Sequence, residues 1–267
     1  MKKKIDAFGD ASIKVPFIIP EITKNDKNAV LNALNSRLLT DGPKLRKFES
    51  IFAKFTGAKF AIGVSNGTAA LHLSLKALGI GKGSEVIIPD ITFVATASSV
   101  LLTGATPVLA DVDENLNILI PSIKKSITSR TKAIIPVHFA GKSCKINEIT
   151  SIARKNTIPI IEDCAHAIGA RVNSKHVGIF GQAGCFSFYP TKNFTTIEGG
   201  MVVTNSKNIA DFVRYARNHG ITKTLTSRFS SGKPWDYDVK NSGYNYRLDE
   251  IRASLGINQI KRVKKMN

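Results

Sequence analysis

The stretch SFYPTKNFTTIEGG, residues 187–200, places a single lysine among aromatic rings, hydroxyls and glycines. Between Gly178 and Ser206 only Lys192 and Glu198 carry a charge, although the chain holds 38 lysines and arginines. A lone lysine in a polar loop is most often simply exposed to solvent. Burial, in contrast, lowers the pKa of a lysine and makes its amine a nucleophile toward carbonyl groups. Lys192 is therefore a candidate catalytic residue, provided that the rest of the fold places it in a pocket.

Strand-like and helix-like segments alternate on both sides of this stretch, which predicts an α/β fold with a mostly parallel sheet covered by helices. Several of the strands are apolar without alternation, as expected when both faces are buried. The predicted strands are 59–64, 85–89, 106–112, 132–137, 158–163, 184–188 and 200–205. The predicted helices run from Pro43 to a stop at Gly57, from the SNGT motif (65–68) onward, and over 92–102, 147–155, 206–218 and 248–267.

Three of the strands end in residues that could take part in chemistry, and ligands of α/β sheets bind at the carboxyl ends of strands. The segment 65–68 opens a helix and could bind phosphate through its backbone amides, or it could be an ordinary helix cap. Asp163 ends an apolar strand, and it could face a site or cap the next helix. Lys192 follows a third strand. A phosphate cradle, a carboxylate and a reactive lysine on one sheet edge are the groups that pyridoxal phosphate needs.

The composition limits the other classes of function. The net charge is +18, which would suit nucleic acid or an anionic substrate, but the basic residues are spread along the whole chain. No apolar run is long enough to span a membrane and the N-terminus has no signal peptide pattern, so we expect a cytoplasmic protein without membrane contact. Cys144, Cys164 and Cys185 form no CxxC pair, which favours reduced core thiols and no metal site.

The chain resembles the DegT/DnrJ/EryC1/StrS family of pyridoxal-phosphate-dependent sugar aminotransferases, which have the aspartate aminotransferase fold (fold type I). The resemblance runs from about Val15 to the last residue and rests on motifs in the same order. These are LLTDGPKLRKFE (38–49), SNGTAALHL (65–73), PDITFVATASSVLLTGATPVLADVD (89–113), IPIIEDCAHAIGA (158–170), GCFSFYPTKNFTTIEGGMVVTN (184–205), RNHG (217–220) and GYNYRLDEIRASLG (243–256). It implies a three-layer sandwich around the sheet.

The resemblance also implies a role for each matching site residue. Lys192 would form the Schiff base with the cofactor, and Asp163 would pair with the pyridinium nitrogen. His166 would lie near the phenolic oxygen, and Phe93 would stack on the ring. Gly67, Thr68 and Ser187 would hold the phosphate, and Asn245 would reach the phosphate of a neighbouring subunit, which implies a homodimer with shared active sites.

The family acts on nucleotide-linked keto sugars, usually with glutamate as amino donor, and two departures from its pattern stand out. Lys145 occupies a position where the family commonly has an acidic residue. The smaller C-terminal domain of the family is expected to be missing after Asn267. We therefore expect an N-terminal segment (1–24), a cofactor-binding large domain (25–247) and the start of a helix (248–267) leading to the absent domain.

Three other functions compete with an aminotransferase. The dehydratase branch of the family carries histidine in place of the lysine, so Lys192 argues against it. A truncated, non-catalytic member could keep the fold and bind the cofactor in a regulatory or structural role. A nucleic-acid-binding protein would rest on the net charge alone.

Overall fold

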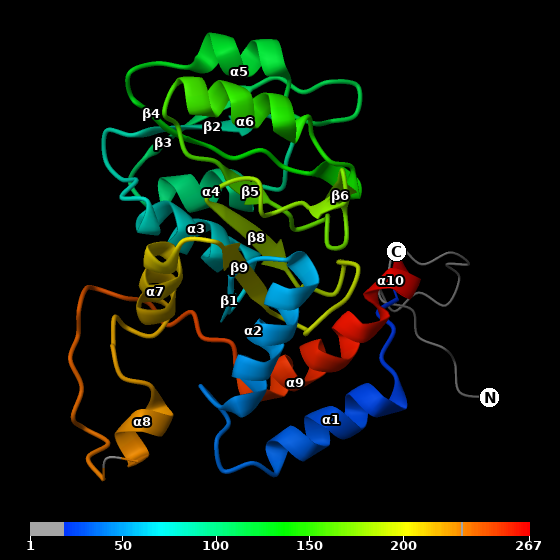
Figure 1. The fold of residues 1–267 in the computed structure, drawn as a ribbon, viewed down its shortest axis with the longest axis vertical. Coiled ribbons are helices and arrows are strands. Elements are labelled where there is room, and N and C mark those ends of the chain that lie inside the picture. The colour runs from blue at the N-terminus through cyan, green and yellow to red at the C-terminus, as the bar shows by residue number, and fades with distance from the viewer. Residues whose placement is uncertain (1–18, 231) are drawn as a thin grey trace.

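The computed structural model describes residues 19–230 and 232–267 (Figure 1). Residues 1–18, most of the predicted N-terminal segment, lie outside the described part. The divisions of the chain predicted from sequence, at residues 24 and 247, remain predictions.

The central sheet is built from two groups of strands. A four-stranded part has the order β1-β9-β8-β5, and a three-stranded part has the order β3-β2-β4. Parallel bridges from Ile134 to Ile160 and from Val137 to Asp163 join the two parts. Strand β9 is antiparallel to both of its neighbours, whereas the other pairs are parallel, so the predicted mostly parallel sheet is confirmed. The strands are β1 (Phe60–Val64), β2 (Glu85–Pro89), β3 (Thr106–Ala110), β4 (Thr131–Ile134), β5 (Ile161–Asp163), β8 (Ala183–Ser187) and β9 (Gly200–Thr204).

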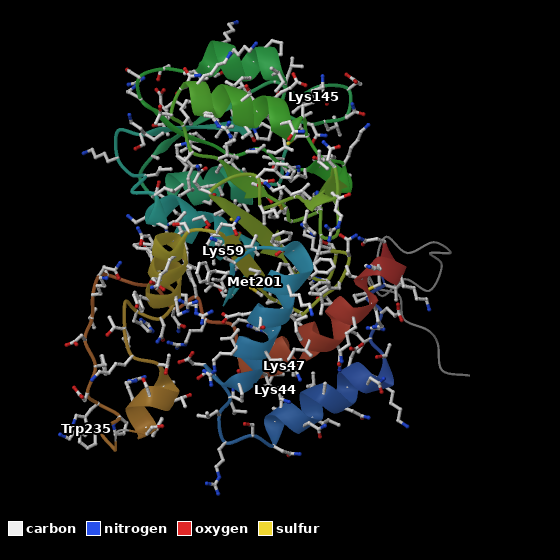
Figure 2. The ribbon with its side chains drawn as sticks, in the orientation of Figure 1. Lys44, Lys47, Lys59, Lys145, Met201 and Trp235 are labelled. Atoms are coloured by element: carbon white, nitrogen blue, oxygen red, sulfur yellow. The ribbon has the colours of Figure 1, made fainter. Side chains whose placement is uncertain are left out.

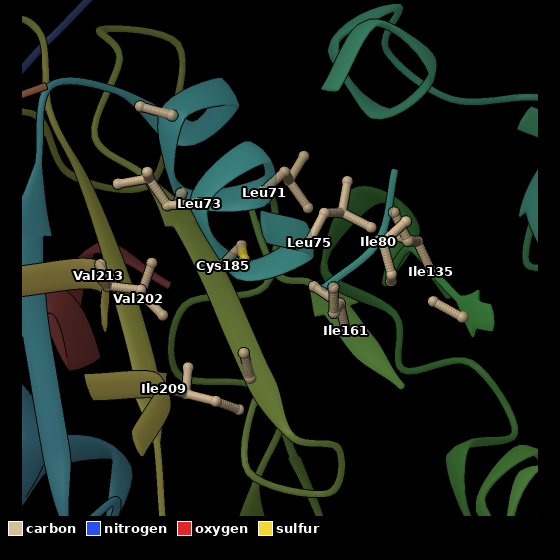
Figure 3. Packing of buried hydrophobic residues seen from close by; sticks show 14 of the residues in the cluster. Leu71, Leu73, Leu75, Ile80, Ile135, Ile161, Cys185, Val202, Ile209 and Val213 are labelled. Atoms are coloured by element: carbon tan, nitrogen blue, oxygen red, sulfur yellow. The ribbon is translucent and has the colours of Figure 1, made fainter. Parts of the chain in front are cut away.

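Helices cover both faces of the sheet, and strand β9 shows how the sequence produces the layers. Its Val202 packs in one core cluster, with residues of α3 and α7, while Met201 and Val203 pack in another, with α2 and α9. Figure 3 shows the first of these clusters, in which leucines of α3 lie against Val202 and Val213. A third cluster lies between β2, β4, α5 and α6. The period-two alternation of β9 therefore generates the three-layer sandwich.

The helices confirm most of the sequence-based expectations. They are α1 (Lys24–Leu34), α2 (Pro43–Thr56), α3 (Gly67–Ala77), α4 (Ala95–Leu101), α5 (Ile120–Ser126), α6 (Ile146–Lys155), α7 (Lys207–Ala216), α8 (Leu225–Ser230), α9 (Glu250–Gln259) and α10 (Val263–Met266). The helix predicted over 248–267 is interrupted by a 3-10 turn, η2 (Ile260–Arg262), and a second 3-10 turn is η1 (Phe139–Gly141). Helices α1, α5 and α8 and the hairpin of β6 (Arg171–Val172) and β7 (Lys175–His176) were not predicted from the sequence.

Basic residues occur on many elements rather than on one surface. Figure 2 labels Lys44 and Lys47 on α2, Lys59 before β1, and Lys145 at the start of α6, well apart from α2. These labelled lysines of the described chain do not gather into one basic patch of the kind that binds nucleic acid. Among the described residues, no helix combines the length and the apolar composition needed to cross a membrane.

The carboxylate of Glu250, in the first turn of α9, caps the beginning of α2. Gly42 has no side chain with which to cap this helix. Glu250 replaces that cap by accepting hydrogen bonds from the backbone amides of Gly42 (3.0 Å), Lys44 (2.7 Å) and Leu45 (2.8 Å). A Cβ atom at Gly42 would lie 2.6 Å from the Glu250 carboxyl carbon, so the cap also requires glycine there. This buried contact fixes α9 against α2.

We expect Glu250→Gln to lower the free energy of unfolding by about 2 to 3 kcal/mol, because an amide group replaces a charged oxygen that accepts from backbone N–H groups. Urea unfolding followed by circular dichroism measures the change. Glu148→Gln, on an exposed part of α6, is the matched control and should cost at most about 0.5 kcal/mol. Equal stability of the two variants would contradict the role of Glu250 as a cap.

Candidate active site

A cavity of about 620 Å³ lies at the carboxyl ends of β1, β5 and β8. It brings together residues that are far apart in the sequence. Every residue predicted to bind a cofactor lines this cavity except Asn245: Gly67, Thr68, Phe93, Asp163, His166, Ser187 and Lys192.

The beginning of α3 forms a cradle for an anion at one end of the cavity. Asn66 caps the helix by accepting a hydrogen bond from the amide of Ala69 (2.8 Å), which leaves Gly67 and Thr68 as the first residues of the helix. The first amides of a helix have no acceptor within the helix and favour negative charge. A Cβ atom at Gly67 would lie 2.9 Å from the Cβ of Ser187, so glycine allows the serine hydroxyl to approach the helix end. This cradle suits a phosphate group.

Asp163 ends β5 with its carboxylate in the wall of the cavity. Its Oδ1 accepts a hydrogen bond from the amide of Ala165 (3.0 Å), and its Oδ2 accepts one from the hydroxyl of Thr96 (3.0 Å). The side chain is almost fully buried. Each carboxylate oxygen can accept a further hydrogen bond, so Asp163 can still receive a proton donor from the cavity.

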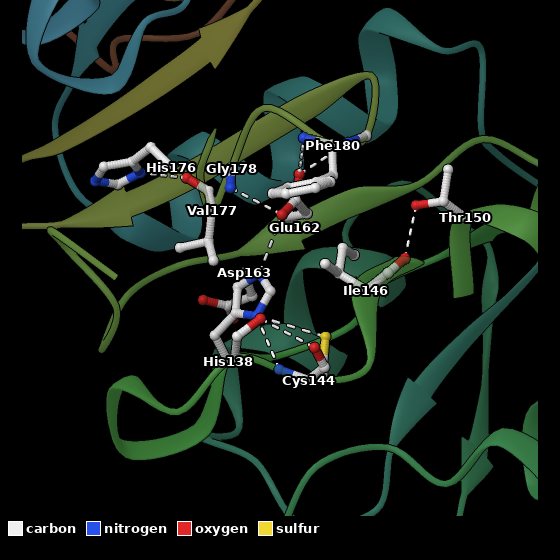
Figure 4. A network of polar contacts seen from close by, with 12 residues as sticks. His138, Cys144, Ile146, Thr150, Glu162, Asp163, His176, Val177, Gly178 and Phe180 are labelled. Carbon is white, nitrogen blue, oxygen red and sulfur yellow. Dashed lines mark hydrogen bonds and ion pairs between the residues drawn. The ribbon is translucent and has the colours of Figure 1, made fainter. Parts of the chain in front are cut away.

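The preceding residue, Glu162, points away from the cavity and holds a loop. Its carboxylate accepts hydrogen bonds from the amides of Gly178 (2.8 Å), Phe180 (2.7 Å) and Gly181 (2.8 Å), and it lies 3.1 Å from Nε2 of His138 (Figure 4). His138, Glu162 and Cys164 are close enough together to hold a metal ion. The carboxylate is already fully hydrogen-bonded, however, and burial raises the pKa of the Cys164 thiol to about 12, so this cluster is better explained as a structural clamp.

His166 lines the cavity three residues after Asp163. Its Nδ1 accepts a hydrogen bond from the amide of Ala140 (3.4 Å), which assigns the proton of the neutral ring to Nε2. Burial lowers the pKa of His166, the charge of Lys192 lowers it further, and the charge of Asp163 opposes the shift. A neutral imidazole with a free Nε2–H can donate a hydrogen bond to an oxygen of a bound molecule.

Lys192 is half-buried in the loop that follows β8. Burial lowers the pKa of its amine, and the negative charge of Asp163 acts in the opposite direction. A larger fraction of the amine is therefore neutral, and nucleophilic, than in an exposed lysine at the same pH. The fold thus places Lys192 in a pocket, as the sequence analysis required of a catalytic candidate.

Asn245 lies outside the cavity, on an exposed part of the chain. Its neighbours Tyr244 and Tyr246 stack on each other with ring centroids 5.0 Å apart, and both contact the buried ring of His72 on α3. This packing explains His72 as a structural residue. Asn245, which lies between the two tyrosines in the sequence, is exposed. Its predicted action at a second subunit remains a prediction.

Thr96 is a site residue that the sequence analysis missed. It is fully buried in the first turn of α4 and donates to Asp163, 67 positions away. The pair Thr92 and Thr96, one helical turn apart beside Phe93, is the only signal in the sequence that could have indicated it.

The loop between Lys192 and β9 contains a backbone conformation that is unfavourable for its residue. Ile197 has a φ angle of 72°, in the left-handed region that β-branched residues avoid. The turn is held by a hydrogen bond from the Ile197 amide to Oγ1 of Thr195 (2.8 Å) and one from Oγ1 of Thr196 to the carbonyl of Glu198 (2.8 Å). Glu198 lines the cavity, so the strained residue lies next to the site.

We expect Ile197→Gly to be more stable than Ile197→Ala by about 1 kcal/mol, because only glycine adopts this backbone conformation without steric cost. Urea unfolding of the two variants measures the difference. At Ile91, which is also exposed but has no positive φ, the order should reverse and alanine should be the more stable residue. The same order at both positions would contradict the strain at Ile197.

We expect the amine of Lys192 to titrate at a lower pH than most exposed lysines. Asp163→Asn should lower the pKa of this amine further, because the carboxylate favours the protonated amine. NMR of the reductively ¹³C-methylated protein, without cofactor, follows each lysine, and Lys192→Arg assigns the signal. Asp90→Asn, at an exposed position outside the cavity, is the control and should leave the signal unchanged. An upward shift in Asp163→Asn would overturn the proposed electrostatics.

Comparisons with known proteins agree with this geometry. The model of the DegT/DnrJ/EryC1/StrS aminotransferase family matches residues 20–267. The spore coat polysaccharide biosynthesis protein SpsC of Bacillus subtilis is 44% identical over 253 residues, which cover 94% of this chain and 65% of SpsC.

Solved structures of similar proteins have the same fold. PseC of Helicobacter pylori, an aminotransferase involved in the biosynthesis of pseudoaminic acid, aligns with a TM-score of 0.86 at 36% identity over 93% of this chain and 66% of PseC. The PLP form of Spr1654 from Streptococcus pneumoniae aligns with a TM-score of 0.87 at 30% identity, over 95% of this chain and 68% of Spr1654. The chain thus spans about two thirds of the length of these relatives, and it belongs to the DegT/DnrJ/EryC1/StrS aminotransferase family.

Proposed function

We propose that this chain carries the pyridoxal phosphate site of an aminotransferase that transfers an amino group, with glutamate as donor, to a nucleotide-linked keto sugar in amino-sugar or polysaccharide biosynthesis. The observation that carries the proposal is the meeting of three groups in one cavity. These are the anion cradle at the start of α3, the carboxylate of Asp163 and the half-buried amine of Lys192.

The residues of the cavity fit the cofactor group by group. The amides of Gly67 and Thr68 and the hydroxyl of Ser187 would hold the phosphate. Asp163 would pair with the ring nitrogen, and Nε2–H of His166 would donate to the phenolic oxygen. Phe93, of which 69% is exposed at the cavity wall, would cover one face of the ring.

The reaction needs a group that stores an electron pair and a base that moves a proton. When bound, pyridoxal phosphate supplies the electron sink. Lys192 would hold the cofactor through its amine, and its Nζ would serve as the base that moves a proton between two carbons of the reacting molecule. The lowered pKa of the Lys192 amine suits this role, because the neutral amine is the form that accepts a proton.

We further propose a cytoplasmic homodimer in which Asn245 of one subunit reaches the phosphate site of the other. The exposure of Asn245 on its own chain and its position between two packed tyrosines support this arrangement. The excess of basic residues would aid the capture of a nucleoside diphosphate. A non-catalytic cofactor-binding protein with a regulatory or structural role is the second candidate, because the same cavity residues would bind the cofactor in either case.

We expect purified protein mixed with pyridoxal phosphate to show a visible absorption band that is lost in Lys192→Ala, because among the described residues Lys192 is the lysine that lines the cavity and offers its half-buried amine to the aldehyde. Addition of glutamate should then shift the band. The measurement is an absorption titration of both proteins.

Lys145→Ala, which changes a lysine outside the cavity, is the control and should keep the band. A band that depends on Lys192 but does not respond to glutamate would favour the non-catalytic candidate. A wild-type protein without any band would show that Lys192 is not a cofactor lysine.

A further inference from the structure

The buried hydroxyl of Thr96 makes an unusual contact for a helical threonine. Buried threonine and serine side chains in helices commonly bond to a backbone carbonyl of their own helix. Two nearby hydroxyls do so: Ser99 on α4 donates to the carbonyl of Thr96 (2.9 Å), and Thr103, in the turn after α4, donates to the carbonyl of Val100 (2.7 Å). Thr96 instead donates to Oδ2 of Asp163, on the central strand β5.

The direction of the hydrogen bonds around Thr96 follows from the chemistry of its partners. An ionised carboxylate can only accept, so the Thr96 hydroxyl must donate its hydrogen to Asp163. The oxygen of Thr96 lies 2.9 Å from that of Thr92, and it is then free to accept from the Thr92 hydroxyl. The result is a chain of two hydroxyls that runs from the cavity wall at Thr92 to the carboxylate.

Two donors on different sides therefore hold the carboxylate of Asp163. The amide of Ala165 bonds to Oδ1 and the hydroxyl of Thr96 bonds to Oδ2, which restricts rotation of the carboxylate plane. A hydrogen bond to a buried charged group also contributes more than one between neutral groups. Without Thr96, the backbone amide of Ala165 would be the remaining hydrogen-bond donor to the Asp163 carboxylate among the described residues.

The same short segment carries Phe93, which lies between the two threonines in sequence. Residues 92–96 thus supply a ring at the cavity wall and the support of the carboxylate. A shift of this segment would move both together. The segment would therefore couple Phe93, which would cover the face of the cofactor ring, to Asp163, which would contact the ring nitrogen.

We propose that Thr96, supported by Thr92, is a positioning residue that orients Asp163 toward the ring nitrogen of the cofactor. This inference rests on the proposed function. Thr96 does not itself line the cavity, and it would act on a bound ligand only through Asp163.

Three variants test the proposal. Thr96→Val removes the hydroxyl and keeps the shape of the side chain, while Thr96→Ser keeps the hydroxyl. Thr103→Val removes a comparable buried hydroxyl that has no contact with Asp163, and it controls for a general loss of stability.

The first measurement uses the protein without cofactor. The ¹³Cγ signal of Asp163, assigned with Asp163→Asn, should move in Thr96→Val and return toward the wild-type position in Thr96→Ser, because carboxyl shifts report hydrogen bonding. It should stay unchanged in Thr103→Val. An unchanged signal in Thr96→Val would overturn the proposal, whatever the protein does with pyridoxal phosphate.

The second measurement is the binding and visible spectrum of pyridoxal phosphate. Thr96→Val should weaken the binding of pyridoxal phosphate by about 5- to 20-fold. The loss is smaller than that of a direct hydrogen bond to a charged group, because Thr96 acts through Asp163. The pH midpoint of the visible band should rise, because a less firmly protonated ring nitrogen withdraws less electron density from the Lys192 nitrogen. Thr96→Ser should restore both values.

The outcomes separate this proposal from the proposed function. A moved ¹³Cγ signal with unchanged cofactor binding and pH midpoint would overturn the positioning role. Equal effects of Thr96→Val and Thr103→Val on the spectrum would also overturn it, because they would reflect stability alone. A wild-type protein that binds no pyridoxal phosphate would contradict the proposed function, and the cofactor role of Thr96 with it, whereas the ¹³Cγ result would still decide whether Thr96 holds Asp163.

Discussion

Two adjacent carboxylates on β5, Glu162 and Asp163, point to opposite sides of the sheet, and the site depends on this arrangement. A strand alternates its side chains, so one residue cannot be moved to the other face without reversing its neighbour. Glu162 uses its charge to bind three backbone amides of the loop before β8. Asp163 uses its charge at the cavity. The strand therefore fixes, in two residues, both the path of the chain toward β8 and the carboxylate of the site.

The consequences of the Glu162 contact extend to Ser187 and Lys192. The loop that Glu162 holds leads directly into β8. Ser187 is the last residue of β8, and Lys192 lies in the loop that follows this strand. On the other side of β8, strand β9 runs antiparallel, so the chain returns beside the cavity through the turn that contains Ile197. The cradle at Gly67 then depends on the close approach of Ser187. The Glu162 contact thus helps to fix the loop that leads into β8, the strand that brings Ser187 beside Gly67.

Local sequence signals predicted the elements of the fold better than the contacts between them. The stop of α2 at Gly57, with its positive φ of 80°, and the apolar strands were readable from the residues themselves. Helix α1 was missed although Thr23 and Asp26 form a capping box at its start, because the helix lacks a clear apolar stripe. The antiparallel direction of β9 was not predicted, since the alternation of its side chains gives a strand but not its direction. The same limit applies to Glu250 and α2, which are about 200 positions apart.

The sequence predicted residues that line the cavity, but not Thr96, which donates a hydrogen bond to Asp163 from behind the cavity wall. Asp163 stands out because it ends an apolar strand, and Lys192 because it is one of only two charged residues between Gly178 and Ser206. Thr96 is neutral and common in helices, so only its distance to Asp163 in the folded chain reveals it. Asn245 was expected to act on a second subunit, and one chain by itself neither brings it to the cavity nor tests that expectation.

The balance of charge in the cavity follows from the competition between burial and Asp163. Burial lowers the pKa of the Lys192 amine and of the His166 ring, and Asp163 opposes both shifts without reversing them. Asp163 therefore acts on two bases whose pKa values burial lowers. An anion bound at the amides of Gly67 and Thr68 would add negative charge to the cavity and raise the pKa of both bases. The neutral form of the Lys192 amine is thus most populated before an anion binds, and a bound anion would favour the protonated form.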